Sequence, residues 1–543
     1  MAAPIQELPP DYYLDNFQYL LSFVVDHYGS RLSVAERDWH ARVTGLPEPA
    51  RRLYIRLVMR RGPVFRVARL SYPEIGDIDC AVDDLLCAGL GDNCDAVPTV
   101  DLLATLTRPD LLALPADEKP PAGLRKDGLV TWLAERDVRP TERFISLDGL
   151  EHLRVFKLFF FGNLRQDFTE FVLNDLGVTP FEKYAVDPAS NWLTDRELVD
   201  QALVIDDLSA VSHAVVHVGD VLLLTTFASL LPAPPEQPRL RSRYDRIVNR
   251  VARQLERIGA FEDAAALFRR SLATPARERR ARVAVAQGDY RSAEDICTTI
   301  LDTPLDEQEQ EFAIRFLHKI RRHCDTVLPA SSVAWLQYRP VTEEICLSPS
   351  EVRVEQAAVA WYEEHGADAY YVENSLVPGL FGLTFWDIIF SPADNAFYNP
   401  FQRGPEDLFT PEFRSRGAAA INARLDLTRD LDRWSALVFD TFEQKYGITN
   451  HFVHWSWLDP GLLRRFMLSP AGLCLGAVFD RMLRDLRQHR SGFPDLVVFR
   501  DGDCRLVEVK GPGDKLQEHQ RRWLRFFDEI GLPASVLNVS YTA

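Results

Sequence analysis

The feature that most constrains this chain is a pair of short apolar segments near its C-terminus, in which single charges interrupt runs of valine, leucine and phenylalanine. One reads Phe-Pro-Asp-Leu-Val-Val-Phe and the other Leu-Val-Glu-Val-Lys. Apolar, β-branched runs of this length favour strands. Asp501-Gly502, which lies between them, is a typical hairpin turn. We therefore predict two strands, over residues 494–499 and 504–510, joined as a hairpin.

The charges of this hairpin form a candidate metal site. Asp495 begins the first strand, within reach of Glu508 on the second, and Glu508 and Lys510 share one face because they lie two residues apart. Buried charges are costly unless they are compensated, and Mg²⁺ or Mn²⁺ binds carboxylate and carbonyl oxygens. Such an ion polarises a phosphoryl oxygen and activates water, while Lys510 would orient the water or stabilise developing charge. The pattern predicts metal-dependent phosphodiester hydrolysis.

A polar residue in the following helix supports this interpretation. The helix is expected over residues 516–530, and Gln520 lies in register with the apolar Leu516 and Leu524. A buried amide needs hydrogen-bond partners, which a metal–phosphate site would supply. The alternative explanation of the same charges is a structural cluster of ion pairs at a strand end.

The rest of residues 346–543 predicts an α/β domain around the hairpin. We expect a helix over residues 351–364, an extended segment over residues 370–373, an apolar helix over about 380–390 and a last strand over residues 535–541. Glu373 by itself is most simply interpreted as a surface carboxylate.

Residues 1–90 predict a winged-helix-like module of short helices followed by a strand-like segment over residues 64–70. Arg52, Arg56 and Arg60 are spaced four apart, so they share one helix face. Residues 31–70 hold ten arginines and three acids, which is a candidate phosphate-binding track. Solvated helix faces are the plainer explanation of the same charges.

The middle of the chain predicts two further regions. In residues 91–235, the segment from Gly123 to Leu129, which includes Lys126, resembles the turn of a SAP-type DNA-binding hairpin, and the proline-rich residues 232–238 are a candidate linker. Residues 236–345 hold two copies of Gly-x-aromatic-x-x-Ala that start at Gly259 and Gly288. This spacing is typical of helical pairs of the tetratricopeptide kind.

Composition limits the remaining possibilities. A chain of 543 residues is expected to hold three or four domains. The net charge of −17 argues against a general nucleic-acid coat but permits local basic surfaces. No apolar run of membrane-spanning length and no leader is evident, and none of the eight cysteines forms a Cys-x-x-Cys pair. We expect a protein of the bacterial cytoplasm, associated with the nucleoid, without a zinc site and without a membrane partner.

The C-terminal segment from Gly492 to Leu524 closely resembles the VRR-Nuc domain of the PD-(D/E)xK nucleases. The longer resemblance is to the Fanconi-associated nuclease family. It includes Val-Glu-Asn-Ser around Glu373, Gly-Leu-Thr-Phe-Trp-Asp-Ile-Ile-Phe from Gly382, and Arg-Leu-Tyr-Ile-Arg-Leu from Arg52. Asn374 stands where the family motif has glycine.

This resemblance implies roles for particular residues. Asp495 and Glu508 would be metal ligands with the carbonyl of Val509, for one or two Mg²⁺ or Mn²⁺ ions, and Glu373 would be an additional acidic ligand. Lys510 would be the catalytic lysine and Gln520 a supporting residue. A loose match of residues 275–280 to the family's pocket for a 5′ phosphate suggests Arg277 and Arg279 as DNA-binding residues.

The resemblance also implies an activity. Family members are 5′-flap endonucleases and 5′-to-3′ exonucleases that act in DNA repair, including repair of interstrand cross-links. We expect branched or 5′-flap DNA as the partner, a monomer as the favoured state, and no ubiquitin binding. Two alternatives stay open: a junction-resolving or restriction-type nuclease, which often acts as a dimer, and a non-catalytic helical-repeat scaffold that binds DNA.

Overall fold

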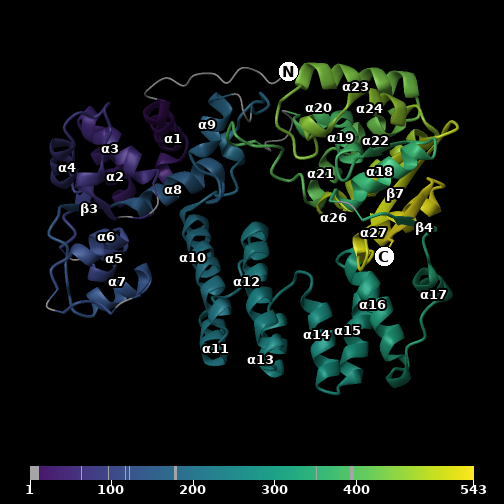
Figure 1. Cartoon of the computed structure of the whole chain (residues 1–543), viewed down its shortest axis with the longest axis horizontal. Coiled ribbons are helices and arrows are strands. Elements are labelled where there is room, and N and C mark those ends of the chain that lie inside the picture. The colour runs from purple at the N-terminus through teal and green to yellow at the C-terminus, as the bar shows by residue number, and fades with distance from the viewer. Residues whose placement is uncertain are drawn as a thin grey trace. The chain divides into compact units, whose positions relative to one another are not determined.

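The structure is a computed structural model. It describes residues 12–60, 62, 64–95, 97–116, 118–121, 123–176, 180–349, 351–391 and 397–542. The chain is mostly helical and divides into two compact units (Figure 1). One comprises the described residues of Met1–Arg196 and Pro392–Gln402, and the other those of Glu197–Ser391 and Arg403–Ala543.

The first unit begins with four helices and a small antiparallel sheet. The helices are α1 (Tyr12–Tyr28), α2 (Val34–Gly45), α3 (Glu48–Val58) and α4 (Ile78–Cys87). The strands are ordered β1 (Val64–Arg66), β3 (Phe144–Leu147) and β2 (Gly91–Asp92). Because the central strand β3 comes from residues beyond 90, the winged-helix-like module is completed by a distant part of the sequence.

The strand expected over residues 64–70 is shorter than predicted. It ends at Arg66, and residues Val67–Arg69 form a 3₁₀ turn. Arg66 pairs in register with Phe144, which is the first residue of β3. One more backbone hydrogen bond, of 3.0 Å from the Val67 amide to the Arg143 carbonyl, lies beyond this pair, and the 3₁₀ turn then takes the chain away from β3.

A small helical cluster contains the expected SAP-like turn. Its helices α5 (Thr99–Ala104), α6 (Arg108–Ala113) and α7 (Lys126–Ala134) enclose buried leucines, among them Leu103, Leu111 and Leu133. Lys126 begins α7, and its Nζ donates a 2.8 Å hydrogen bond to the Ala104 carbonyl. This predicted DNA-binding residue thus contributes to joining α5 and α7.

Two further helices complete the first unit: α8 (Leu150–Phe161) and α9 (Thr169–Asp175). The α8 helix buries a run of aromatic residues, and the short segment 397–402 packs beside it. Tyr398 Oη donates a 3.2 Å hydrogen bond to the Phe161 carbonyl, and Gly162, where α8 ends, lies too close to the Tyr398 ring to tolerate a Cβ.

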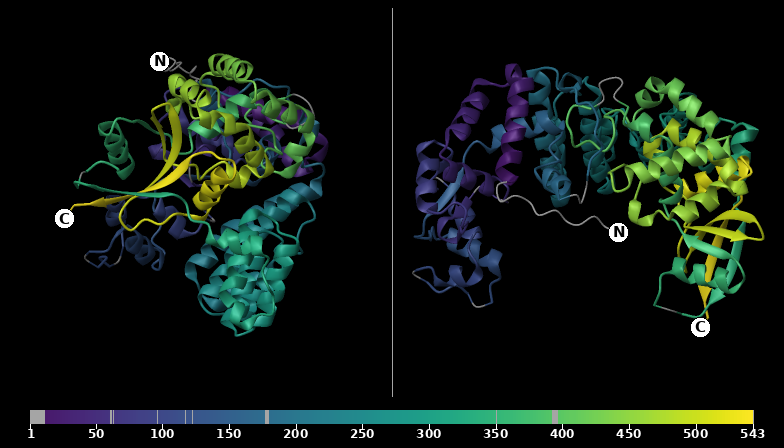
Figure 2. Two further views of the ribbon diagram at one scale, coloured as in Figure 1. Left: turned by 90° about the vertical axis from the view of Figure 1, so that its right-hand side faces the viewer. Right: turned by 90° about the horizontal axis from the view of Figure 1, so that it is seen from above.

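The second unit starts with a stack of antiparallel helices, shown in teal in Figures 1 and 2. The helices are α10 (Arg196–Val218), α11 (Val221–Leu230), α12 (Pro238–Arg257), α13 (Phe261–Phe268), α14 (Ala276–Ala286), α15 (Tyr290–Asp302) and α16 (Glu307–Ile320). A short helix, α17 (Ala330–Gln337), follows on the connection to the sheet. The two repeated motifs are the turns of α12–α13 and α14–α15. Gly259 and Gly288 have φ values of 85° and 80°, and the motif alanines, Ala264 and Ala293, are fully buried.

The proline-rich residues 232–238 are not a linker between units. They connect α11 to α12 within the second unit, and Tyr244 Oη donates a 3.0 Å hydrogen bond to the Pro232 carbonyl. Prolines end helices in tight interhelical loops as well as in linkers, so the composition does not distinguish the two. The division of the chain instead falls between Arg196 and Glu197.

The C-terminal part of this unit is built on a five-stranded mixed sheet. Its order is β4 (Thr342–Leu347), β8 (Ala534–Tyr541), β7 (Asp503–Lys510), β6 (Leu496–Arg500) and β5 (Asp368–Tyr371). The predicted hairpin is β6–β7, in which Leu496 pairs with Val507. Helix α18 (Val354–Glu364) buries Ala358 and Tyr362 against one face of the sheet. Helix α27 (Glu518–Glu529) approaches the other face, toward which Glu508 points.

A helical insertion separates β5 from β6 in the chain. It comprises α19 (Leu376–Thr384), α20 (Trp386–Ile389), α21 (Pro411–Arg416), α22 (Ala418–Leu427), α23 (Leu431–Lys445), α24 (Pro460–Met467), α25 (Leu475–Arg484) and α26 (Leu486–His489). The single helix expected over 380–390 is divided after Thr384. The Thr384 carbonyl accepts a hydrogen bond from Arg424, and its hydroxyl accepts one from Trp434.

Among the described residues, no single helix has the length and apolar composition needed to cross a bilayer. Two consecutive helical segments, Pro460–Met467 and Pro470–Arg484, have that length and composition only when they are counted together. The chain bends by 73° between them.

Candidate active site

Asp495 ties together three strands of the sheet. Its Oδ2 accepts a 2.8 Å hydrogen bond from the amide of Val509 on β7, and its carbonyl accepts one of 2.8 Å from the amide of Val372, just after β5. The residue is 7 % exposed. The carboxylate is therefore held at the junction of β5, β6 and β7, as the predicted hairpin requires.

Glu508 is the most deeply buried acid of the group, at 1 % exposure. Its Oε1 accepts a 2.6 Å hydrogen bond from Gln520 Nε2 and lies 2.7 Å from Lys510 Nζ. Its Oε2 is buried and has no hydrogen-bond partner among the described residues. A buried carboxylate oxygen without a partner is costly, and a cation beside it would remove that cost.

Gln520 is positioned by the start of α27. Its Oε1 accepts a 2.9 Å hydrogen bond from the backbone amide of Gln517, and the two residues form a capping box. The same side chain thus caps the start of the helix and donates a hydrogen bond to Glu508. The expected helix begins two residues later than predicted, at Glu518, so Leu516 lies outside it, whereas Leu524 is buried as expected.

Glu373 follows the edge strand β5 and lies beside the same cluster. Its Oε2 accepts a 2.5 Å hydrogen bond from Tyr371 Oη, and its Oε1 accepts one of 3.2 Å from Asn374 Nδ2. Asn374 has a φ of 50°, in the left-handed region that glycine adopts readily and asparagine tolerates. Its Oδ1 also accepts a 2.8 Å hydrogen bond from the amide of Gly492. The exchange of glycine for asparagine therefore preserves the turn that presents Glu373.

Burial and neighbouring charge raise the pKa values of Glu508 and Asp495. Burial raises the pKa of Glu508 to about 8, and the charges of Asp495 and Glu373 act in the same direction, against Lys510. Burial also raises the pKa of Asp495 to about 6, and Glu373 contributes to that increase. Burial and the hydrogen bond to Glu373 raise the pKa of Tyr371. Clustered carboxyl groups with raised pKa values are typical of functional sites, and a bound cation would reverse these shifts.

The donor set fits a magnesium-type ion that keeps water and substrate ligands. No three His, Cys, Asp or Glu side chains in the described part of the chain are arranged as a ready metal cage. Mg²⁺ is commonly held by only one or two carboxylates, and substrate phosphates complete its shell. Asp495 and the unpartnered Oε2 of Glu508 provide those two carboxylates, next to the Val509 peptide and near Glu373.

Sequence reasoning missed Tyr371 and Glu355 beside this centre, and it gave Asn374 no role. Tyr371 holds Glu373, and Asn374 shapes the turn after it. Glu355, in the first turn of α18, is close enough for its charge to raise the pKa values of Asp495 and Tyr371. Tyr371 could have been found by its spacing, because it lies two residues before Glu373 in the segment that the sequence predicts to be extended. Nothing in the α18 sequence indicates Glu355.

The three N-terminal arginines are engaged within the first unit. Arg52 forms a 2.6 Å ion pair with Glu48, and Arg56 forms one of 2.7 Å with Glu74. Arg60 lies over the Tyr72 ring, 5.9 Å from its centroid. Arg52 and Arg56 share a face of α3, but this helix ends at Val58, so Arg60 lies beyond it. The Arg52 and Arg56 guanidinium groups already have carboxylate partners.

Arg277 and Arg279 are likewise bound within the helical stack. Arg277 Nε donates a 2.8 Å hydrogen bond to Glu309, whose side chain is fully buried, and Arg279 Nε donates one of 2.8 Å to Glu256. These arginines join α14 to α16 and to α12.

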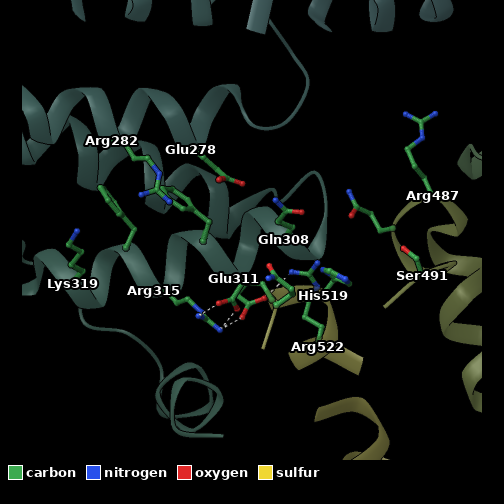
Figure 3. Close-up of a pocket in the computed structure, with 15 residues that line it drawn as sticks. Glu278, Arg282, Gln308, Glu311, Arg315, Lys319, Arg487, Ser491, His519 and Arg522 are labelled. Carbon is green, nitrogen blue, oxygen red and sulfur yellow. Dashed lines mark hydrogen bonds and ion pairs between the residues drawn. The ribbon is translucent and has the colours of Figure 1, made fainter. Parts of the chain in front are cut away.

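A pocket of about 630 Å³ opens instead between α14, α16 and the start of α27. Figure 3 shows the arginines and acids that surround it. The basic residues that line it are Arg282, Arg315, Lys319, Arg487, His519 and Arg522. Arg315 and Arg522 are paired with Glu311. His519 directly precedes Gln520 in the chain, so the pocket and the carboxylate centre share the start of α27.

The fold and the site define a nuclease of the VRR-Nuc class. The sequence model of the VRR-NUC domain matches residues 432–541, and that of the FAN1 HTH domain matches residues 11–91. A Fanconi-associated nuclease 1 homolog of Pseudomonas aeruginosa is 32 % identical over 98 % of this chain and 96 % of that protein. The human Fanconi-associated nuclease 1 is 34 % identical over 34 % of this chain and 19 % of its own length.

The fold of almost the entire chain matches a crystal structure of paFAN1. That structure contains 5′-flap DNA with a gap and a flap of two nucleotides. The TM-score is 0.90 at 32 % identity, and the match covers 99 % of this chain and 100 % of that one. A second structure, with a one-nucleotide flap, matches with a TM-score of 0.89. The chain belongs to the Fanconi-associated nuclease 1 family and is a DNA nuclease.

Proposed function

We propose that this nuclease cuts branched DNA at 5′ flaps and degrades it from 5′ ends, with Mg²⁺ or Mn²⁺, in DNA repair that includes interstrand cross-links. The observation that carries the proposal is the unpartnered, buried Oε2 of Glu508 beside Asp495, which indicates a cation site. The match of nearly the full chain to a structure with flap DNA supports the choice of substrate.

The residues of the centre divide the work of phosphodiester hydrolysis. Asp495 and Glu508, with the Val509 carbonyl and Glu373, would hold one or two ions, which polarise the scissile phosphate and activate water when bound. Lys510 Nζ, 2.7 Å from Glu508, is placed to stabilise negative charge on the phosphate oxygens. Gln520 fixes the orientation of Glu508 by its hydrogen bond. Tyr371 holds Glu373 from the other side.

The pocket beside α27 is the part of this unit best suited to hold the 5′ end of the cut strand. Arg282, Arg487 and His519 line it from three different elements. Because His519 and Gln520 are consecutive, an end phosphate in the pocket would lie at a fixed separation from the carboxylate centre. This separation would set how far from the 5′ end the strand is cut. Contacts to a phosphate carry no base-sequence information, so the pocket would select a DNA end and not a sequence.

The test is cleavage of an end-labelled 5′-flap duplex with Mg²⁺ or Mn²⁺, beside EDTA and the Glu508→Ala variant. We expect incision near the flap junction that requires metal and is lost in the variant. Tight flap binding without any cleavage would instead support the scaffold alternative. Preferred cleavage of four-way junctions by a dimer would support the junction-resolving alternative, and sedimentation of the complex measures its stoichiometry.

A further inference from the structure

Trp457 is the only exposed tryptophan among the described residues, at 58 % exposure. An indole ring left in water forgoes the burial that its large apolar area would otherwise gain. Isolated exposed aromatic side chains on a rigid surface are typical of binding sites for flat ligands. The surroundings of Trp457 indicate which ligand this is.

The turn that carries Trp457 is fixed on both sides. It is the 3₁₀ turn Trp455–Trp457, in which Trp455 Nε1 donates a 2.7 Å hydrogen bond to the Ile448 carbonyl and the Trp455 ring packs 5.3 Å from that of Phe442. On the other side, Leu458 is buried against Gly379, where an added Cβ would come within 2.7 Å of it. The exposed ring is therefore presented from anchored backbone.

Trp457 adjoins the carboxylate centre through Tyr371. The two ring centroids are 6.1 Å apart and the rings are inclined by 56°. Tyr371 Oη donates to Glu373, and the charge of Glu373 acts on both Asp495 and Glu508. The packed rings of Trp457 and Tyr371 thus lie on the side of the site that holds Glu373.

We infer that Trp457 is a stacking platform for a nucleobase of the DNA strand that enters the carboxylate centre. The Trp457 ring lies 6.1 Å from the Tyr371 ring, whose hydroxyl contacts Glu373. Successive nucleotides of a strand rise by roughly 3.4 Å along a duplex, so a base a few nucleotides from the scissile phosphate reaches this ring. Every base has a π face, so this contact holds the strand without selecting a sequence.

The inference rests on the proposed function only in requiring that a DNA strand occupies the carboxylate centre. Trp457 itself would not contact the reacting atoms. Its role is to position the strand, so the loss of the ring should raise KM and lower kcat/KM more than kcat when the substrate is intact.

The experiment combines a variant with an altered substrate. Trp457→Ala should cut an intact 5′-flap substrate about 5- to 150-fold less efficiently, the range that corresponds to one base–aromatic stack, and Trp457→Phe should recover most of the activity. A series of substrates with one abasic nucleotide at each position near the cut should contain one position that reduces wild-type cleavage to the same extent. At that position the abasic site should cost Trp457→Ala nothing further.

A matched control is Leu468→Ala, which removes a side chain of similar exposure, 54 %, from the end of α24. We expect unchanged cleavage, and circular dichroism and thermal unfolding should show all three variants folded. Full activity in Trp457→Ala would overturn the inference. So would a Trp457→Ala enzyme in which an abasic site at every position lowers cleavage by the same factor as it does in the wild type. The latter result combined with loss of binding to another protein would identify the ring as a protein contact.

A second readout does not depend on cleavage. 2-Aminopurine is placed in turn at each position near the flap junction. At one position it should lose fluorescence when wild-type protein binds in EDTA, and it should keep its fluorescence there with Trp457→Ala. A wild-type enzyme that quenches the probe but cuts no flap would contradict the proposed function and leave the stacking site in place. Cleavage without quenching at any position would contradict the stacking site alone.

Discussion

Gln520 donates its 2.6 Å hydrogen bond to Glu508 Oε1, the same oxygen that lies 2.7 Å from Lys510 Nζ. Both donors therefore act on one side of the carboxylate, and Oε2 is left for another ligand. The orientation of Oε2 depends on these two contacts. This arrangement makes Gln520 a residue that acts through Glu508 rather than on the substrate.

Gln520→Ala should lower metal affinity or activity by about 10- to 100-fold, as is common when a partner of a metal ligand is removed. The measurement is cleavage rate against Mn²⁺ concentration, in which the midpoint should move to higher metal. Gln517→Ala is the matched control, because Gln517 forms the other half of the same helix cap but no hydrogen bond to Glu508. Equal effects of the two substitutions would show that only the helix cap matters.

Removing the charge of Glu508 should stabilise the metal-free protein near neutral pH while it abolishes cleavage. The pKa of Glu508 is raised from 4.5 to about 8, so the folded chain binds this proton more tightly than the unfolded chain does. Its contribution to stability is therefore fully present below pH 4.5 and is lost as the pH rises through 8. Glu508→Gln should remove this pH dependence.

Chemical unfolding in EDTA at pH 6 and pH 8.5 measures that effect. We expect Glu508→Gln to gain up to about 5 kcal/mol over the wild type at the higher pH and about 2 kcal/mol at pH 6. Saturating Mg²⁺ should stabilise the wild type and leave the variant unchanged. A variant that is less stable than the wild type at both pH values would contradict a buried, repelled carboxylate.

The centre could be predicted from the sequence because its pattern is local. Strand periodicity alone puts Glu508 and Lys510 on one face, and a two-residue turn brings Asp495 beside them. Gln520 could be placed because helical spacing is equally regular. These relations span few residues, and no distant packing is needed to produce them.

The remainder depends on contacts between residues far apart in the chain. β3 completes the N-terminal sheet from beyond residue 140, and Arg56 meets Glu74 across a loop. Charge patterns in the sequence show where arginines gather but not which acids face them. For the same reason, the sequence does not distinguish the exposed Trp457 from the partly buried Trp455 two residues earlier.

Asn374 gives a test of the turn that presents Glu373. Its φ of 50° disfavours residues other than glycine and asparagine, so Asn374→Ala should lower the unfolding free energy by about 1–2 kcal/mol. Asn374→Gly relieves the backbone but still loses the hydrogen bond to Gly492, so it should be more stable than the alanine variant. Thermal unfolding ranks the three proteins, and an alanine variant as stable as the glycine variant would show that the turn relaxes without strain.

Arg277 and Arg282 lie on the same helix, α14, yet substitution of Arg277 should lower stability and substitution of Arg282 should lower DNA binding. Arg277 neutralises Glu309, a carboxylate with no exposed side-chain surface. Arg277→Ala leaves that charge buried without its main partner, which should cost about 3 kcal/mol of unfolding free energy. Arg282 lies over the Phe312 ring at the pocket wall. Arg282→Ala should change stability little and should weaken binding of flap DNA.

The two variants are separated by measuring stability and substrate choice together. For Arg282→Ala we expect the ratio of cleavage between flaps with a 5′ phosphate and a 5′ hydroxyl to fall toward one, because the pocket loses a cation. For Arg277→Ala we expect that ratio to persist at temperatures where the variant is folded. If Arg277→Ala instead lost the preference with its stability intact, the 5′ end would be bound at the outer side of α14, away from the start of α27. The cut position would then be set by a different surface.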